Sequence, residues 1–127
     1  MRKDEFLTKV QTLGGLPSAK DAARWSTAAV RALAQLTPEP ELRRHFISQL
    51  PGFLKSPLHD DPPPALLTDR DGFVQHVAAA LGTHAPEGER AVHAVYRVLK
   101  EALSAGQIAE FEASIPGDIA AFLERAA

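Results

Sequence analysis

The chain has 127 residues, of which 45% are hydrophobic and 24% charged, as in one globular domain rather than a disordered chain. Its 14 Lys and Arg against 16 Asp and Glu give a net charge of -2, which disfavours nucleic acid as a partner. The absence of Cys excludes disulfides and zinc–thiolate sites, and no apolar run is long enough to span a membrane, so we expect a cytoplasmic protein.

The first half of the chain predicts three helices, each with apolar residues at helical spacing, over residues 6–13, 18–36 and 40–50. Helix signals flank them: Gly14-Gly15 after the first, a capping sequence from Ser18 to Asp21 before the second, and Thr37 to Pro40 before the third. Trp25 lies in register with the stripe of the second helix, which indicates a core residue more than a binding anchor. Pro51 ends the third helix, because a residue that precedes proline is pushed out of the α region.

Between Ser56 and Asp69 the composition changes to a proline-rich segment of about 14 residues. Pro57 and the three prolines at 62–64 exclude regular helix and favour an extended, polyproline-like conformation. We therefore predict a linker over residues 56–69, which follows a bend at Pro51-Gly52 and a short apolar run.

The second half predicts the same plan, with helices over residues 69–81, 86–103 and 104–115 and a short amphipathic helix at 119–123. Asp69 or Asp71 caps the first of these, and Gly82 ends it. Ser104 to Gln107 form a capping box with the preferred residue types at both ends. No segment alternates as a strand does.

The two halves are related by a nearly constant offset. Phe6 corresponds to Phe73, Arg31 to Arg97 and Pro51 to Pro116, with very little slippage between these landmarks. Each half, at about 60 residues, would be marginal alone. We therefore predict a single domain over residues 1–127, an all-α helical bundle of two pseudo-symmetric three-helix repeats packed into one core. Repeat one covers residues 1–58 and repeat two covers residues 69–127.

Short motifs in this order resemble a bacterial family of uncharacterised proteins, the domain of unknown function 2267 (DUF2267). They are Phe6-Leu7-Thr8-Lys9-Val10, Val30-Arg31-Ala32-Leu33 and Gln49-Leu50-Pro51. The resemblance covers nearly the whole chain and implies an all-helical fold, but it supplies no catalytic residue. The chain differs from the family pattern at Lys55, where the family often has Arg, and in its proline-rich connector.

Four side chains are weak candidates for a metal site, because imidazole and carboxylate groups are common metal ligands: His59, Asp61, Glu89 and His93. Adjacent residues such as those at 59–61 rarely point at one metal. The pair on the helix over residues 86–103 also fits an ordinary solvent-facing row of charges, which we favour.

A small basic cluster, Arg43-Arg44-His45, is a possible surface for a partner, although a solvated helix face explains it equally well. No serine lies in a nucleophile turn, and no glycine-rich loop marks a phosphate or cofactor site. We nominate no catalytic residue and no cofactor.

The leading hypothesis is a non-catalytic interaction or regulatory module that binds a protein partner or associates with itself. The alternatives are a small-molecule-binding protein or enzyme that uses a cleft between the repeats, and a histidine-based metal protein.

Overall fold

The computed structural model describes residues 1–125, and this part of the chain forms eight α-helices and no strand. In chain order they are α1 (Lys3–Gly14), α2 (Ala19–Gln35), α3 (Pro40–Ser48), α4 (Gly52–Asp60), α5 (Arg70–Leu81), α6 (Ala85–Ala102), α7 (Ala105–Ala113) and α8 (Gly117–Glu124). The predicted all-α fold is confirmed.

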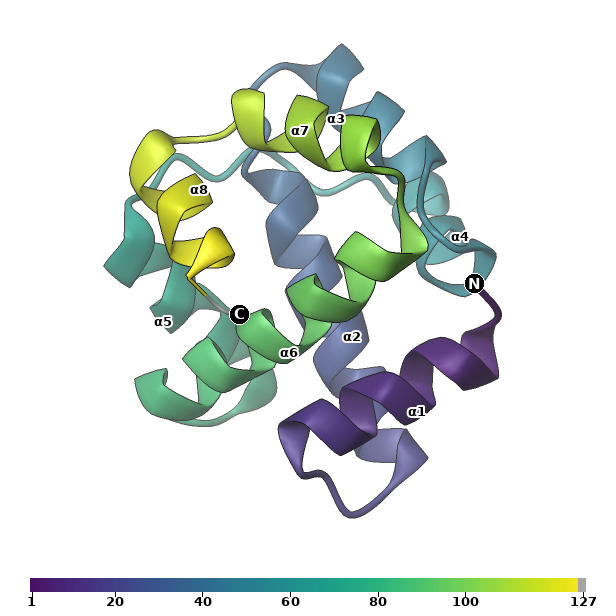
Figure 1. Cartoon of the computed structure of the whole chain (residues 1–127). Coiled ribbons are helices and arrows are strands. Elements are labelled where there is room, and N and C mark those ends of the chain that lie inside the picture. The colour runs from purple at the N-terminus through teal and green to yellow at the C-terminus, as the bar shows by residue number, and fades with distance from the viewer. Residues whose placement is uncertain (126–127) are drawn as a thin grey trace.

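The two longest helices, α2 and α6, pack against each other at the centre of the molecule (Figure 1). Both contact α1 and α5, while α3 and α7 lie side by side across the upper end of this group (Figure 1). Buried side chains from both halves form one apolar cluster, whose largest fully buried members are Tyr96, Phe6, Phe73, Leu33, Leu36 and Leu99. The two halves therefore share one core.

The predicted helix-ending glycines and capping serines lie at the ends of the helices, as expected. Gly15 and Gly82 adopt positive φ angles of 63° and 66°, where the left-handed conformation turns the chain out of α1 and α5. The Ser18 hydroxyl accepts a hydrogen bond from the Asp21 N–H, and Ser104 forms the predicted capping box with its partner three residues later.

The prediction that helix is excluded after Ser56 is wrong, because α4 continues through Pro57 to Asp60. A proline inside a helix costs about 3 kcal/mol. Leu54 and Leu58, one turn apart on α4, are buried in the core, and their burial offsets this cost. Pro57 itself is exposed.

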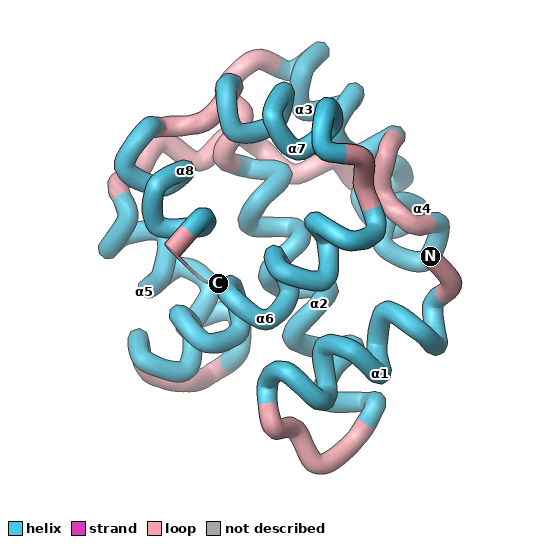
Figure 2. The backbone as a smooth tube through the Cα atoms, viewed as in Figure 1, coloured by secondary structure: helices cyan, strands magenta, loops and turns pink. Residues whose placement is uncertain are grey.

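Only residues 61–69 of the predicted linker form a loop, which joins α4 to α5 (Figure 2). This loop is held against the end of α2. The backbone N–H of Leu66 donates to the carbonyl of Gln35 at 2.8 Å, and the Gln35 side chain donates to the carbonyl of Pro64 at 3.1 Å. The connector is thus attached to the domain by hydrogen bonds.

Two further expectations are corrected. After the first Pro-Gly corner, the expected short apolar run is a complete helix of nine residues, α4, whereas the short amphipathic helix predicted at 119–123 is confirmed as α8, of eight residues. The N-cap of α3 is Glu39, without a side-chain cap, while Thr37 is buried and its hydroxyl meets that of Ser114 at 3.1 Å. Thr37 therefore joins the two halves instead of capping α3.

Contacts between the halves recur at equivalent positions of the two repeats. Arg24 on α2 donates to the carbonyl of Leu81 at 3.4 Å, and Arg90, the equivalent residue on α6, donates to the carbonyl of Gly14 at 2.7 Å. Each arginine thus satisfies a carbonyl at the C-terminal end of the first helix of the other half. These exchanged contacts favour the predicted pseudo-symmetric packing, which stays a prediction.

Candidate functional site

A groove of about 170 Å³ lies between α3 and α7, where the two halves of the chain meet. Its lining comes from the facing sides of these helices and the residues that follow them: Leu42, His45, Phe46, Gln49, Gln107, Glu110, Phe111, Ala113 and Ser114. Most of the lining surface is apolar. The polar groups stand around it, so the groove has an apolar floor and a polar rim.

The floor is a stacked pair of aromatic rings. The ring centroids of Phe46 and Phe111 lie 4.3 Å apart, with 24° between the ring planes. Both side chains are almost completely buried, and the ring of Tyr96 lies 6.3 Å behind Phe111. Such a pair contributes about 0.5–1.5 kcal/mol beyond the area it buries. The floor is therefore part of the core and holds α3 against α7.

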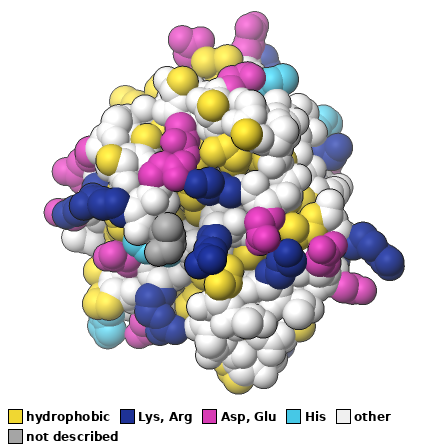
Figure 3. All heavy atoms as spheres, viewed as in Figure 1, with side chains coloured by type: hydrophobic (Ala, Val, Ile, Leu, Met, Phe, Trp, Pro, Cys, Tyr) yellow, Lys and Arg dark blue, Asp and Glu magenta, His cyan; other side chains and the backbone are white. Residues whose placement is uncertain are grey.

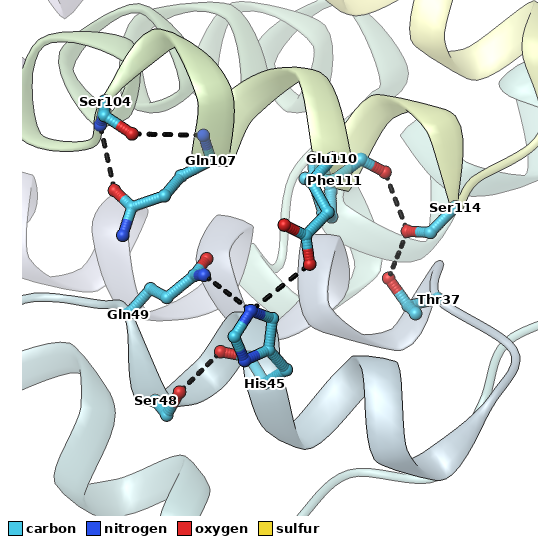
Figure 4. Close-up of polar contacts among 9 residues, drawn as sticks. All are labelled: Thr37, His45, Ser48, Gln49, Ser104, Gln107, Glu110, Phe111 and Ser114. Atoms are coloured by element: carbon cyan, nitrogen blue, oxygen red, sulfur yellow. Dashed lines mark hydrogen bonds and ion pairs between the residues drawn. The ribbon is translucent and has the colours of Figure 1, made fainter.

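The rim carries an ion pair that crosses the groove. The His45 Nε2 atom on α3 lies 3.2 Å from a carboxylate oxygen of Glu110 on α7, and 2.9 Å from the side-chain amide nitrogen of Gln49 (Figure 4). Both members of the ion pair are about half exposed, so its contribution to stability is small. The rim groups can therefore exchange their contacts without a large loss of stability.

Hydrogen bonds close both ends of the groove. Beside one end, Gln107 accepts from the backbone N–H of Ser104 as part of the capping box of α7 (Figure 4). At the other, the hydroxyl of Ser114 donates to the Phe111 carbonyl at 2.7 Å and meets Thr37 across the boundary between the halves (Figure 4). The residues at both ends of the groove are thus held by hydrogen bonds.

Leu42 forms one edge of the groove and is 40% exposed. The spacing of the apolar residues predicted that Leu42 faces the core, but in the structure its side chain is exposed. An exposed leucine beside an apolar floor extends the surface that a bound group could cover.

The three residues of the predicted basic surface do not act together. The guanidinium of Arg43 folds back and donates to the carbonyls of Thr37 and Pro38, at 2.8 Å and 3.2 Å. Arg44 is exposed, while His45 turns into the groove and pairs with Glu110. Successive helical residues point about 100° apart, which explains this separation. One member of the cluster, His45, thus belongs to the groove.

The four predicted metal ligands lie on different surfaces. His59 and Asp61 are exposed at the end of α4, and Glu89 is exposed on α6. His93 is half-buried on α6, and its ring packs against that of Phe122 at 4.4 Å. Among residues 1–125, no group of three or more His, Cys, Asp or Glu side chains is placed to hold a metal ion.

A second polar cluster joins α6, α7 and α8 behind the groove. The hydroxyl of Tyr96 donates to the carboxyl of Glu112 at 2.5 Å, and Lys100 donates to both oxygens of Glu124 at 3.0 Å and 2.6 Å. Burial raises the pKa of Glu112, the neighbouring carboxyl of Glu124 raises it further, and the Tyr96 hydroxyl opposes the shift. The neighbouring carboxyl of Glu112 and the hydrogen bonds from Lys100 lower the pKa of Glu124. The two carboxyl groups are therefore shifted in opposite directions.

The raised pKa of Glu112 predicts the pH dependence of a Glu112→Gln variant. Folded Glu112 keeps its proton to a higher pH than it does in the unfolded chain, so this residue lowers the free energy of unfolding as pH rises above the ordinary value of 4.5. Glutamine stays neutral and can still accept the hydrogen bond from the Tyr96 hydroxyl. We expect the variant to match the wild type near pH 4 and to exceed it by about 0.5–1 kcal/mol at pH 7, because solvent screens part of the effect. Urea unfolding at several pH values measures this difference.

Glu110→Gln is the matched control on the same helix. It loses only the exposed pair with His45, so we expect no gain in stability at pH 7. A Glu112→Gln variant whose unfolding free energy keeps the pH profile of the wild type would show that folding does not raise the pKa of Glu112.

The sequence pointed to only one side of this surface. It pointed to the basic residues of α3, whereas the groove also needs Phe111, Glu110 and Gln107 from α7. One signal was available: Phe46 and Phe111 occupy equivalent positions in the two repeats, and so do His45 and Glu110. Residues in equivalent positions meet when two repeats pack around a two-fold axis.

Comparison with known proteins identifies a family that covers nearly the whole chain. The model of a family described as "Uncharacterized conserved protein (DUF2267)" matches residues 3–122. The resemblance predicted from the short motifs is thereby confirmed. A search of curated proteins found no match. Within residues 1–125, no helix has the length and apolar character needed to cross a membrane.

Proposed function

The chain belongs to the DUF2267 family, whose description names no reaction or ligand, and from this premise we propose a non-catalytic interaction module. Its α3–α7 groove binds a segment of another protein that carries one large apolar side chain. The observation that supports this proposal most strongly is the combination of a small apolar floor with a polar rim between two helices.

The volume of the groove favours a single side chain as its occupant. Pockets for drug-sized molecules or cofactors usually measure about 300–1,000 Å³, and this groove measures about 170 Å³. A leucine, methionine or phenylalanine side chain is of the right size, and protein interfaces are often dominated by one such anchor in a pocket. The floor provided by Phe46 and Phe111 is apolar and suits that anchor.

The rim favours a peptide backbone beside the anchor. The side-chain amides of Gln49 and Gln107 line the groove, and amides can both donate to and accept from the backbone groups of a bound segment. Among residues 1–125, the titratable groups of the rim are limited to Glu110 and His45, which contact each other. We therefore propose a partner segment with an apolar anchor and a mostly uncharged flank.

The proposal predicts the outcome of selecting peptides from a random display library against the folded protein. We expect enriched peptides to share one large apolar residue. Leu42→Asp should weaken their binding at least about tenfold, because the new carboxylate at the groove edge must lose water when the anchor enters. Fluorescence polarisation with a labelled peptide measures the affinity.

Leu67→Asp is the matched control, because Leu67 is 84% exposed and lies on the 61–69 loop outside the groove. It should leave peptide binding unchanged. Equal binding by the two variants, or enrichment of peptides without an apolar anchor, contradicts the proposal. Self-association in sedimentation velocity that Leu42→Asp abolishes would assign the groove to a second copy of the chain and would also overturn it.

A further inference from the structure

A second cavity, of about 190 Å³, lies between α1 and α6 and is distinct from the groove. Five residues line it: Leu13, Arg90, His93, Ala94 and Arg97. The lining thus includes two guanidinium groups and one imidazole, and it includes no carboxylate. In a chain with a net charge of -2, this local excess of positive charge is unexpected.

The two arginines have no acidic partner in the described part of the chain. None of the ion pairs among residues 1–125 includes Arg90 or Arg97. On the face shown in Figure 3, Lys and Arg side chains are interspersed with Asp and Glu, and the neighbouring lysine of α6, Lys100, is paired with Glu124. Among residues 1–125, Arg90 and Arg97 thus keep their charges without an ion-pair partner.

Arg90 is held in position by groups outside the cavity. One nitrogen of its guanidinium donates to the carbonyl of Gly14 at 2.7 Å, and the group lies over the ring of Trp25 at 5.6 Å. A guanidinium has several N–H donors in a planar fork, so this bond leaves others for an acceptor in the cavity. The side chain is thus preorganised.

His93 contributes a buried nitrogen that needs a partner. Its Nε2 atom is buried and makes no hydrogen bond with any residue among 1–125. Burial lowers the pKa of His93, and the positive charge of Arg125 lowers it further. The negative charge of Glu89 and a hydrogen bond with the backbone of Phe122 act in the opposite direction. An unpartnered buried polar atom destabilises the fold, so an acceptor placed beside it would be favoured.

We propose that this cavity is a binding site for a small oxyanion, a phosphate-type group or a carboxylate, held by Arg90, Arg97 and His93. The guanidinium fork matches the oxygens of either group. The imidazole adds a charged hydrogen bond when it is protonated. Because the anion favours the imidazolium form, binding strengthens as pH falls.

The test is a titration of the full chain with sodium sulfate, followed by NMR of the His93 ring, with sodium chloride at equal ionic strength as reference. Sulfate keeps its charge between pH 5 and 8, so any change in affinity reports on the protein. We expect saturable shifts and tighter binding at pH 5.5 than at pH 7.5. Parallel titrations with phosphate and acetate distinguish a tetrahedral oxyanion from a carboxylate.

Arg97→Gln should weaken sulfate binding roughly fivefold or more, because it removes a guanidinium that is exposed and forms no ion pair with any residue among 1–125. Arg31→Gln is the matched control: Arg31 is exposed at the equivalent position of the first repeat, on α2, and does not line the cavity. It should leave the affinity unchanged. The proposal is overturned if sulfate moves the His93 signals no more than chloride does, or if the two variants bind equally.

Discussion

Replacing Phe111 with alanine is expected to lower the free energy of unfolding by about 3–5 kcal/mol, the range for truncating a buried phenylalanine. Phe111 is 3% exposed and connects α7 to α3 through its stack on Phe46. Its loss leaves a cavity under the groove and removes an aromatic contact that holds the two halves together. Urea unfolding followed by circular dichroism measures the change, and Phe46→Ala should cost a similar amount.

The double variant tests whether the two rings stabilise each other. Because the rings are in contact, the combined cost should fall below the sum of the single costs by about 0.5–1.5 kcal/mol. Phe53, which is only partly buried and meets Phe6 edge-on at 5.5 Å, is the control. Phe53→Ala should cost less, and its cost should simply add to that of Phe111→Ala. Additive costs for Phe46 and Phe111 would contradict the role of the stack.

Gly88→Ala is expected to lower the free energy of unfolding by about 1–3 kcal/mol, although alanine favours helix by about 0.5–1 kcal/mol over glycine. A Cβ atom at Gly88 would lie 2.9 Å from the Val74 carbonyl oxygen, 2.9 Å from the Cβ atom of Ala78 and 3.0 Å from its backbone nitrogen. Backbone atoms cannot move aside as a flexible side chain can, so α5 and α6 would have to separate. Chemical denaturation measures the change.

Gly106→Ala provides the matched control inside another helix. At Gly106 the nearest atom to a new Cβ is the Ser104 hydroxyl oxygen at 3.9 Å, and the φ angle is not positive. This variant should gain up to about 1 kcal/mol, because alanine reduces the conformational freedom of the unfolded chain. If both variants gained stability, the close approach of α5 and α6 would not be what requires glycine at position 88.

Local chemistry explains why most helices were predictable. The capping residue Ser104 and the helix-ending residues Gly15 and Gly82 act through neighbours within a few positions, so their effects can be read along the chain. The apolar spacing of α2 and α6 likewise predicted the helices that form the centre of the core. These features led from the sequence alone to an all-α domain.

The helix through Pro57 was not predictable in this way. Proline opposes helix locally, and only the burial of Leu54 and Leu58 against distant parts of the chain reverses that preference. Thr37 is a second case, since its hydroxyl looked like a helix cap but bonds to Ser114 instead. In both, a tertiary contact outweighs a local preference.

The sequence by itself predicted most of the helices, several of their ends and a constant offset between its two halves. Only the tertiary structure decided that α3 and α7 meet, which joins Phe46 to Phe111 and His45 to Glu110 across the boundary between the halves. It also decided that Arg90 and Arg97 line a cavity with His93. The physical reason is that helix formation depends on near neighbours, whereas a surface site depends on which helix faces pack together.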